Sequence, residues 1–328
     1  MIRRSALLAA ASLLSLSVTA HAQDFQPALL FDMGGKFDKS FNEAAYNGAE
    51  KFKAETGISY LEFEVTNESQ RDQALERMAK RASIVVVVGF AFGTSLEGVS
   101  ERYPDAKFTI IDASVDKPNV QSILFKEHEG SYLVGMAAAL KSQTGKIGFV
   151  GGMDIPLIHN FEWGYEQGAK AANPDIEFTA NYVGTTPAAW SDATRAKELA
   201  FSHYDGGADV VYAAAGAAGL GVLEASKDKD KFSIGVDSNQ NHLYPGNVLT
   251  SMLKRVDVAV YEAFKSAQDG SWQPGLLNLG LKEEGVDYAL DEYNKDVLTP
   301  DIVAKLDEAK AKIISGEIQV QDYYSKQQ

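Results

Sequence analysis

Short apolar runs alternate with amphipathic segments along most of the chain, and few folds are compatible with that rhythm. Several runs are rich in Val and Ile on both faces, as in parallel strands that helices cover on each side. Repeated strand–helix units predict an α/β protein built on doubly wound parallel sheets. The expected strands cover residues 28–31, 84–88, 108–111, 146–150, 209–213 and 232–236, and the expected helices cover 41–55, 70–81, 130–142, 160–172, 192–204 and 256–268.

The first 22 residues have the pattern of a secretory signal peptide. Arg3 and Arg4 precede an apolar stretch over 6–18, and a small-x-small cleavage pattern ends at Ala22. The apolar stretch is shorter than the ~20 residues that a membrane span needs. We therefore expect cleavage near Ala22 and a location in a Gram-negative periplasm. The chain contains no cysteine, so we expect neither disulfides nor a lipid attached at the cleavage site.

The remaining chain, roughly 300 residues, has a typical length for two domains. We expect the two lobes to exchange segments. The N-terminal lobe is expected to contain 23–128 plus about 250–282, and the C-terminal lobe 129–249 plus about 283–328. The formal net charge of −14 argues against nucleic acid and anionic membranes as partners, because both are negatively charged. We expect a monomer.

Polar residues follow several of the predicted strands, at positions where open α/β sheets bind ligands. Asp32 ends the first strand, and Asp112, Gly216 and Asp237 follow later ones. Because these positions belong to two predicted sheets, the pattern indicates one ligand held between two lobes.

A helix is expected to begin just after Ser40. In the run from Ser40 to Glu43, the serine matches the N-cap and the glutamate the third helical position of a capping box. Phe41 and Asn42 are then expected on the first helical turn, beside the end of the first strand.

The segment from Phe31 to Asn42 resembles the Asp-x-Gly-x-x-x-Asp-x-Ser-Phe-Asn signature of the basic membrane protein (Bmp/PnrA-like) family. Further matches follow in the right order at residues 151–158, 161–165, 183–192 and 250–257. Members of this family are substrate-binding proteins of ABC transporters, and the characterised ones mainly bind purine nucleosides. The resemblance implies a type I periplasmic-binding-protein fold, with two doubly wound parallel-sheet lobes and hinge crossovers. It also implies a nucleoside ligand, with a purine favoured, and an ABC permease of the inner membrane as partner.

The resemblance further implies how the ligand is held. Phe41 is expected to stack on one face of the base, and Trp190, from the other lobe, to cover the second face. Hydrogen bonds are expected to the base edge from Asn42 and Asp112, to the ribose hydroxyls from Asp32, Asp237 and Lys254, and from the backbone of Gly216.

These residue types suit a nucleoside on physical grounds as well. Aromatic stacking contributes about 1–3 kcal/mol per base, and a carboxylate that accepts from a ribose hydroxyl about 1.5–3 kcal/mol. Three pocket acids against the single Lys254 disfavour a phosphate group, so nucleosides or free bases are preferred over nucleotides. Each residue also has a structural alternative, because rings fill cores and carboxylates cap helices. We assign Phe37, Phe90, Phe92 and Trp163 to core packing.

Enzyme activity is not expected. No His-Glu-x-x-His zinc motif occurs, residues 93–98 have the wrong spacing for a nucleophile elbow, and residues 216–221 lack the Gly-Lys-Ser/Thr ending of a phosphate loop. We expect no metal and no organic cofactor. Two alternatives stay open: a sugar or another heterocycle on the same scaffold, or a ligand sensor that presents its closed form to a membrane receptor.

Overall fold

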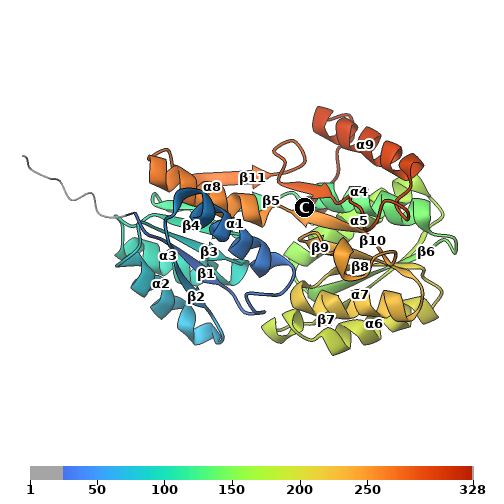
Figure 1. Ribbon diagram of the computed structural model, residues 1–328, viewed down its shortest axis with the longest axis horizontal. Coiled ribbons are helices and arrows are strands. Elements are labelled where there is room, and N and C mark those ends of the chain that lie inside the picture. Colours follow the sequence, from blue (N-terminus) through green and yellow to red (C-terminus); the bar gives the residue numbers. More distant parts are fainter. Residues whose placement is uncertain (1–24, 327–328) are drawn as a thin grey trace, which may run out of the picture.

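The computed structural model describes residues 25–326, which form two lobes lying side by side (Figure 1). Each lobe is a six-stranded sheet with helices on both faces. The predicted signal peptide lies outside the described residues. Within the part of the chain that the structure describes, no helix is long and apolar enough to cross a membrane.

The sheet of the first lobe is parallel throughout, in the order β11-β5-β4-β3-β1-β2. Its central strands β1 and β3 are buried along their whole length, as a sheet covered on both faces requires. The strands are β1 (Pro27–Phe31), β2 (Leu61–Glu64), β3 (Ile84–Val88), β4 (Phe108–Ile111), β5 (Val120–Phe125) and β11 (Gly275–Leu279). The helices are α1 (Phe41–Thr56) and α8 (Val256–Asp269), which pack together on one face, and α2 (Arg71–Ala79) and α3 (Gly93–Arg102) on the other.

The sheet of the second lobe repeats this strand order as β12-β10-β9-β8-β6-β7, and its edge strand β12 runs antiparallel to β10. The strands are β6 (Lys146–Met153), β7 (Glu177–Gly184), β8 (Val210–Ala214), β9 (Phe232–Asp237), β10 (Val248–Lys254) and β12 (Val286–Tyr288). The helices are α4 (Glu127–Lys141), α5 (Pro156–Ala172) and α9 (Pro300–Ser315) on one side, α6 (Ala193–Asp205) and α7 (Gly219–Asp228) on the other, and α10 (Tyr323–Lys326) against α5.

The predicted fold class, two doubly wound α/β lobes, is confirmed. The chain passes between the sheets three times: after β5, after β10 and between β11 and β12. The expected return to the N-terminal lobe near residue 250 is too early. Residues 250–254 belong to β10, which pairs with β9 of the second sheet, and the chain returns only with α8.

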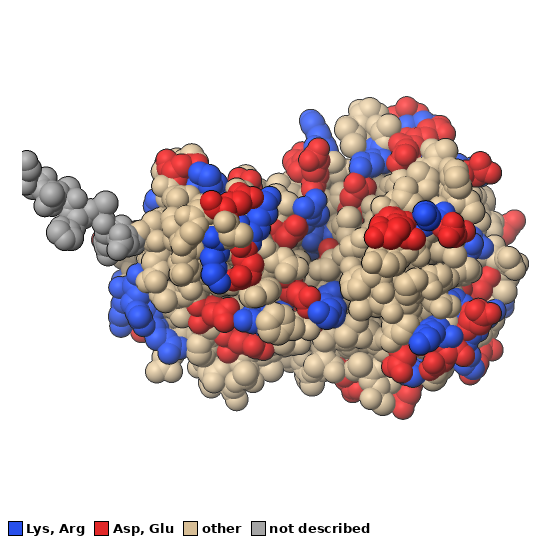
Figure 2. Space-filling model, in the orientation of Figure 1, with Lys and Arg blue, Asp and Glu red and all other residues tan. Residues whose placement is uncertain are grey.

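Surface charge is mixed rather than segregated. Lys and Arg side chains alternate with Asp and Glu over both lobes on the visible face (Figure 2). This face therefore offers no continuous basic surface of the kind that nucleic acids bind.

Candidate functional site

A cavity opens between the lobes at the carboxyl ends of both sheets. It contains about 660 Å³ of empty space, part of it open to solvent. The ends of β1, β3 and β4 line it from the first lobe, and the ends of β8 and β9 from the second. The first turns of α1 and α5 and the short helix η3 (Pro187–Trp190) complete the wall. Doubly wound sheets bind ligands at such strand ends.

Seven of the eight residues expected to contact a ligand line this cavity: Asp32, Phe41, Asn42, Asp112, Trp190, Gly216 and Asp237. The eighth, Lys254, lies directly behind the wall. Its side chain is 1% exposed, and its Nζ is 2.7 Å from Oδ2 of Asp112. The structure therefore brings all eight residues together, and their contacts with a ligand stay a prediction.

The two aromatic residues come from different lobes. Phe41 begins α1 in the first lobe, and Trp190 ends η3 in the second. Each ring is partly buried against the hydrophobic core and also lines the cavity. The cavity is thus bordered by an aromatic ring on each side of the lobe interface.

The position of the Trp190 ring depends on Gly152 in β6. A Cβ atom at Gly152 would lie 2.3 Å and 2.5 Å from ring atoms Cζ3 and Cε3 of Trp190, and 3.2 Å from Cα of Ala215. Non-bonded carbon atoms do not approach each other this closely, so any larger residue at position 152 must displace the ring.

Two hydrogen-bond acceptors in the wall have no partner within residues 25–326. Oδ1 of Asn42 and Oδ1 of Asp112 are buried and accept no hydrogen bond. The amide nitrogen of Asn42 already donates to the backbone oxygens of Gly35, at 3.2 Å, and Asp32, at 3.5 Å. Buried polar atoms without partners are rare and costly. The wall therefore offers two acceptors that a ligand with N–H or O–H donors can satisfy.

Lys254 forms a buried ion triad. Its Nζ lies 2.7 Å from Asp112 of the first lobe and 3.0 Å from Glu127, whose side chain is 2% exposed at the start of α4. Burial alone lowers the pKa of Lys254, but the carboxylates of Asp112, Glu127 and Asp237 outweigh it and raise that pKa above its ordinary value. The ammonium also lies 5.1–5.3 Å from the centres of three rings, those of Phe41, Phe125 and Phe161.

Two aspartates occupy equivalent positions in the two lobes. Asp112 follows β4 with φ 69°, and Asp237 ends β9 with φ 63°, both in the left-handed region that only a few non-glycine residues adopt. Such strained backbone typically costs about 1–3 kcal/mol and is concentrated at functional sites. Burial raises the pKa of Asp237 to about 7, and it also raises that of Asp112, while Lys254 lowers both.

Asp32 has a partner that the sequence pattern did not predict. Arg71, at the start of α2, donates to Oδ1 of Asp32 through Nη2 at 2.9 Å and Nε at 3.3 Å. The backbone N–H of Met33 donates to the same oxygen at 2.8 Å. Oδ1 is therefore engaged within the first lobe, and Oδ2 is the carboxylate oxygen left for a ligand.

The predicted capping box is wrong. Ser40 makes no side-chain cap at α1; the carboxylate of Asp38 instead accepts from the backbone N–H groups of Ser40, Asn42 and Glu43 at 2.8–3.0 Å. Two carboxylate oxygens satisfy more of the free N–H groups of a helix start than one hydroxyl does. Asp38 is only 4% exposed, and burial raises its pKa to about 6 against those hydrogen bonds.

Sequence reasoning missed four charged or aromatic groups at the site: Asp38, Arg71, Glu127 and Phe161. Asp38 stands inside the signature segment and could have been found there. Arg71 and Glu127 give no sequence signal, and they correct the expected balance of three acids against Lys254 alone. Two core assignments are also corrected: Phe90 lines the cavity, and Phe37 is 60% exposed at the surface.

A family model described as ABC transporter substrate-binding protein PnrA-like matches residues 25–323. The ABC transporter nucleoside-binding protein BmpA of Lactococcus lactis is 33% identical over 90% of this chain and 89% of its own length. An uncharacterized lipoprotein of Pyrococcus horikoshii is 39% identical over 80% of this chain and 68% of its own.

Among solved structures, an ABC transporter solute-binding protein from Aeropyrum pernix is similar with a TM-score of 0.82 and 32% identity. The similarity covers 90% of this chain and 92% of that protein. The type I periplasmic-binding-protein fold expected from the sequence is thereby confirmed.

Proposed function

Because this chain belongs to the PnrA-like family of ABC transporter substrate-binding proteins, we propose that it captures a nucleoside between its two lobes and delivers it to an ABC permease. The observation that carries the proposal is the pair of rings, Phe41 and Trp190, which border one cavity from opposite lobes. A base offers two flat faces, and an aromatic ring stacked on each face can hold any base, because every base has such faces. The Lactococcus lactis relative is named a nucleoside-binding protein, which supports the same ligand class.

The unpartnered acceptors support a base with N–H donors. Asn42 and Asp112 each leave a buried oxygen without a hydrogen bond, and the amide nitrogen of Asn42 is already used. Guanine and hypoxanthine carry an N1–H donor on the edge of the ring, whereas adenine presents an acceptor nitrogen at that position and leaves one of the two oxygens without a donor. A 6-oxopurine nucleoside is therefore the favoured ligand.

Carboxylates from both lobes suit the sugar of a nucleoside. In this proposal Asp237 and the free Oδ2 of Asp32 hold the ribose hydroxyls and Gly216 adds a backbone contact, while Lys254 supports the carboxylates from behind the wall. Each charge-assisted hydrogen bond contributes about 1.5–3 kcal/mol. A nucleotide is disfavoured: the buried carboxylates of Asp38, Asp112, Glu127 and Asp237 outnumber the one ammonium, since Arg71 is already paired with Asp32.

The periplasm is the proposed location. The relative from Pyrococcus horikoshii is named a lipoprotein, and a lipoprotein carries its lipid on a cysteine. This chain contains no cysteine, which favours a protein free in the periplasm.

A ligand panel tests the proposal. The mature protein is heated with guanosine, inosine, adenosine, a free base, guanosine monophosphate and a set of pentoses and hexoses. A ligand at about 100 times its Kd stabilises the fold by about 2.7 kcal/mol, a clear shift in Tm. We expect guanosine and inosine to give the largest shifts and the monophosphate a smaller one. A shift with a sugar and none with any nucleoside contradicts the proposal and supports the alternative ligand class.

Replacement of Gly152 by alanine tests the aromatic pair without replacing either aromatic residue. The added methyl group displaces Trp190, so affinity for guanosine is expected to fall about tenfold, close to the effect of losing one stacking ring. Calorimetry of G152A, W190A and the double variant measures it, with G98A on the surface of α3 as control. In the double variant, Gly152→Ala is expected to add little. If G152A binds guanosine as tightly as G98A does, the predicted position of the Trp190 ring is wrong.

A further inference from the structure

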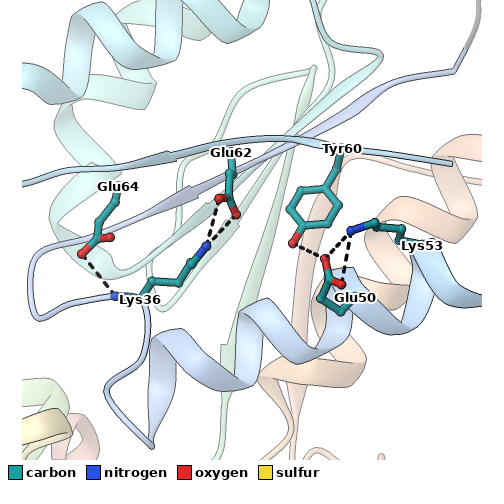
Figure 3. Close-up of polar contacts among 6 residues, drawn as sticks. All are labelled: Lys36, Glu50, Lys53, Tyr60, Glu62 and Glu64. Atoms are coloured by element: carbon teal, nitrogen blue, oxygen red, sulfur yellow. Dashed lines mark hydrogen bonds and ion pairs between the residues drawn. The ribbon is translucent and has the colours of Figure 1, made fainter.

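The loop before α1 belongs to the first lobe and reaches across to the second. Lys36 anchors it to β2: its backbone N–H donates to Glu64 at 3.2 Å, and its ammonium lies 2.9 Å from Glu62 (Figure 3). Further along α1, Glu50 accepts hydrogen bonds from Tyr60 and Lys53 (Figure 3). The loop therefore moves with the first lobe.

Four hydrogen bonds join the end of this loop to the end of β9 and the residues just after it. The hydroxyl of Ser238 donates to the backbone oxygen of Ser40 at 2.8 Å, and the amide of Gln240 donates to that of Lys39 at 3.0 Å. The hydroxyl of Ser40 donates to Oδ2 of Asp237 at 2.5 Å. The same hydroxyl lies 3.3 Å from the backbone oxygen of Val236, and of the four bonds only the two from Ser40 reach residues that line the cavity.

Ser40 is available for this contact because its side chain does not cap the helix. Asp38 satisfies the N–H groups at the start of α1, so the hydroxyl of Ser40, which is 0% exposed, is left to bond elsewhere. Within residues 25–326 its hydroxyl is the one hydrogen-bond donor to the carboxylate of Asp237. A buried carboxylate with a single donor depends strongly on that donor.

We propose that Ser40 is a positioning residue that crosses from the first lobe to orient the carboxylate of Asp237 for the ligand. The inference rests on the proposed function, because it assumes that the ligand occupies this cavity. The first lobe thereby supplies the donor that completes a binding carboxylate of the second lobe.

The pH dependence of binding follows from the charges around Asp237. Burial raises its pKa to about 7; Lys254 and the hydrogen bond from Ser40 lower it, while Asp38 and Asp112 raise it. Ligand hydroxyls that donate to the carboxylate favour its ionised form, so the pKa of Asp237 is lower with ligand bound. Binding therefore releases a proton, and affinity increases as the pH rises through the range near 7. Loss of the Ser40 hydroxyl raises the pKa of Asp237 further and moves this increase to higher pH.

Two serine variants separate the positioning of Asp237 from a general contribution to the contact between the lobes. Ser40→Ala removes the donor to Asp237, and Ser238→Ala removes a hydroxyl that crosses the same interface without touching that carboxylate. The Kd for guanosine is measured by calorimetry from about pH 5.5 to 8.5. At pH 7, S40A is expected to bind about tenfold more weakly than wild type, the low end for a charge-assisted hydrogen bond, with its pH midpoint shifted upward. S238A is expected to keep the wild-type midpoint. Identical pH curves for the two variants overturn the inference.

A measurement without ligand separates this inference from the proposed function. The carboxyl carbon of Asp237, identified by comparison with D237N, is titrated by NMR in wild type and S40A, after a melting curve has shown that S40A is folded. We expect the pKa of Asp237 to be higher in S40A. If guanosine binds wild type and this pKa is unchanged, the role of Ser40 is wrong; if no nucleoside binds, the proposed function fails and the titration still decides the role of Ser40.

Discussion

Replacement of Lys254 by methionine is expected to lower the free energy of unfolding by about 3–5 kcal/mol, because it leaves buried carboxylates without their cation. The side chains of Asp112 and Glu127 are 6% and 2% exposed, and both lie within 3.0 Å of the lost ammonium. Methionine has nearly the length of lysine, so the change removes charge rather than volume. Urea denaturation at about pH 7.5 measures the effect. At about pH 5 the loss is expected to shrink, because the carboxylate of Asp112, whose pKa burial raises to about 6, takes up a proton.

The matched control is Lys265→Met on the outer surface of α8. Lys265 and its partner Asp269 are 40% and 46% exposed, and such surface pairs contribute about 0–1 kcal/mol. A second variant, Lys254→Met with Asp112→Asn, is expected to recover part of the lost stability by removing one uncompensated charge. If K254M and K265M unfold at the same urea concentration, Lys254 does not balance the buried acids.

Replacement of Trp190 by alanine is expected to weaken nucleoside binding by about 1–3 kcal/mol, the contribution of one stacking ring. The fold should be little affected, because the ring lies at the edge of the cavity rather than inside a sheet-covered core. Calorimetry gives the affinity, and a melting curve without ligand checks stability.

Phe37→Ala is the control for this experiment. Phe37 is an aromatic residue in the loop before α1, but it is 60% exposed and does not line the cavity. We expect F37A to bind guanosine as wild type does and W190F to retain most of the affinity. An unchanged affinity in W190A removes Trp190 from the binding site.

Several central elements were predictable because their burial leaves a local pattern, although the largely buried strands β5 and β10 were not among those expected. The fully buried strands β3 and β4 have the bounds expected from their apolar runs, and α1 begins at the predicted residue. The edge strands β2 and β7 were missed, since exposed residues alternate with half-buried ones in them and dilute their apolar signal. The exchange point after β10 was placed too early, because a strand pattern does not reveal which of two sheets the strand joins.

By itself, the sequence determined that the chain forms two doubly wound lobes and that polar strand ends and two aromatic residues meet in one cleft. Local periodicity specifies helices and strands, and parallel topology carries strand ends to a common edge. Only the tertiary structure decided which buried charges are compensated and by what. Arg71 reaches Asp32 across 39 positions, Lys254 reaches Asp112 across 142, and Ser40 reaches Asp237 across 197. Those pairings depend on distances in space, and the order of residues along the chain does not contain them.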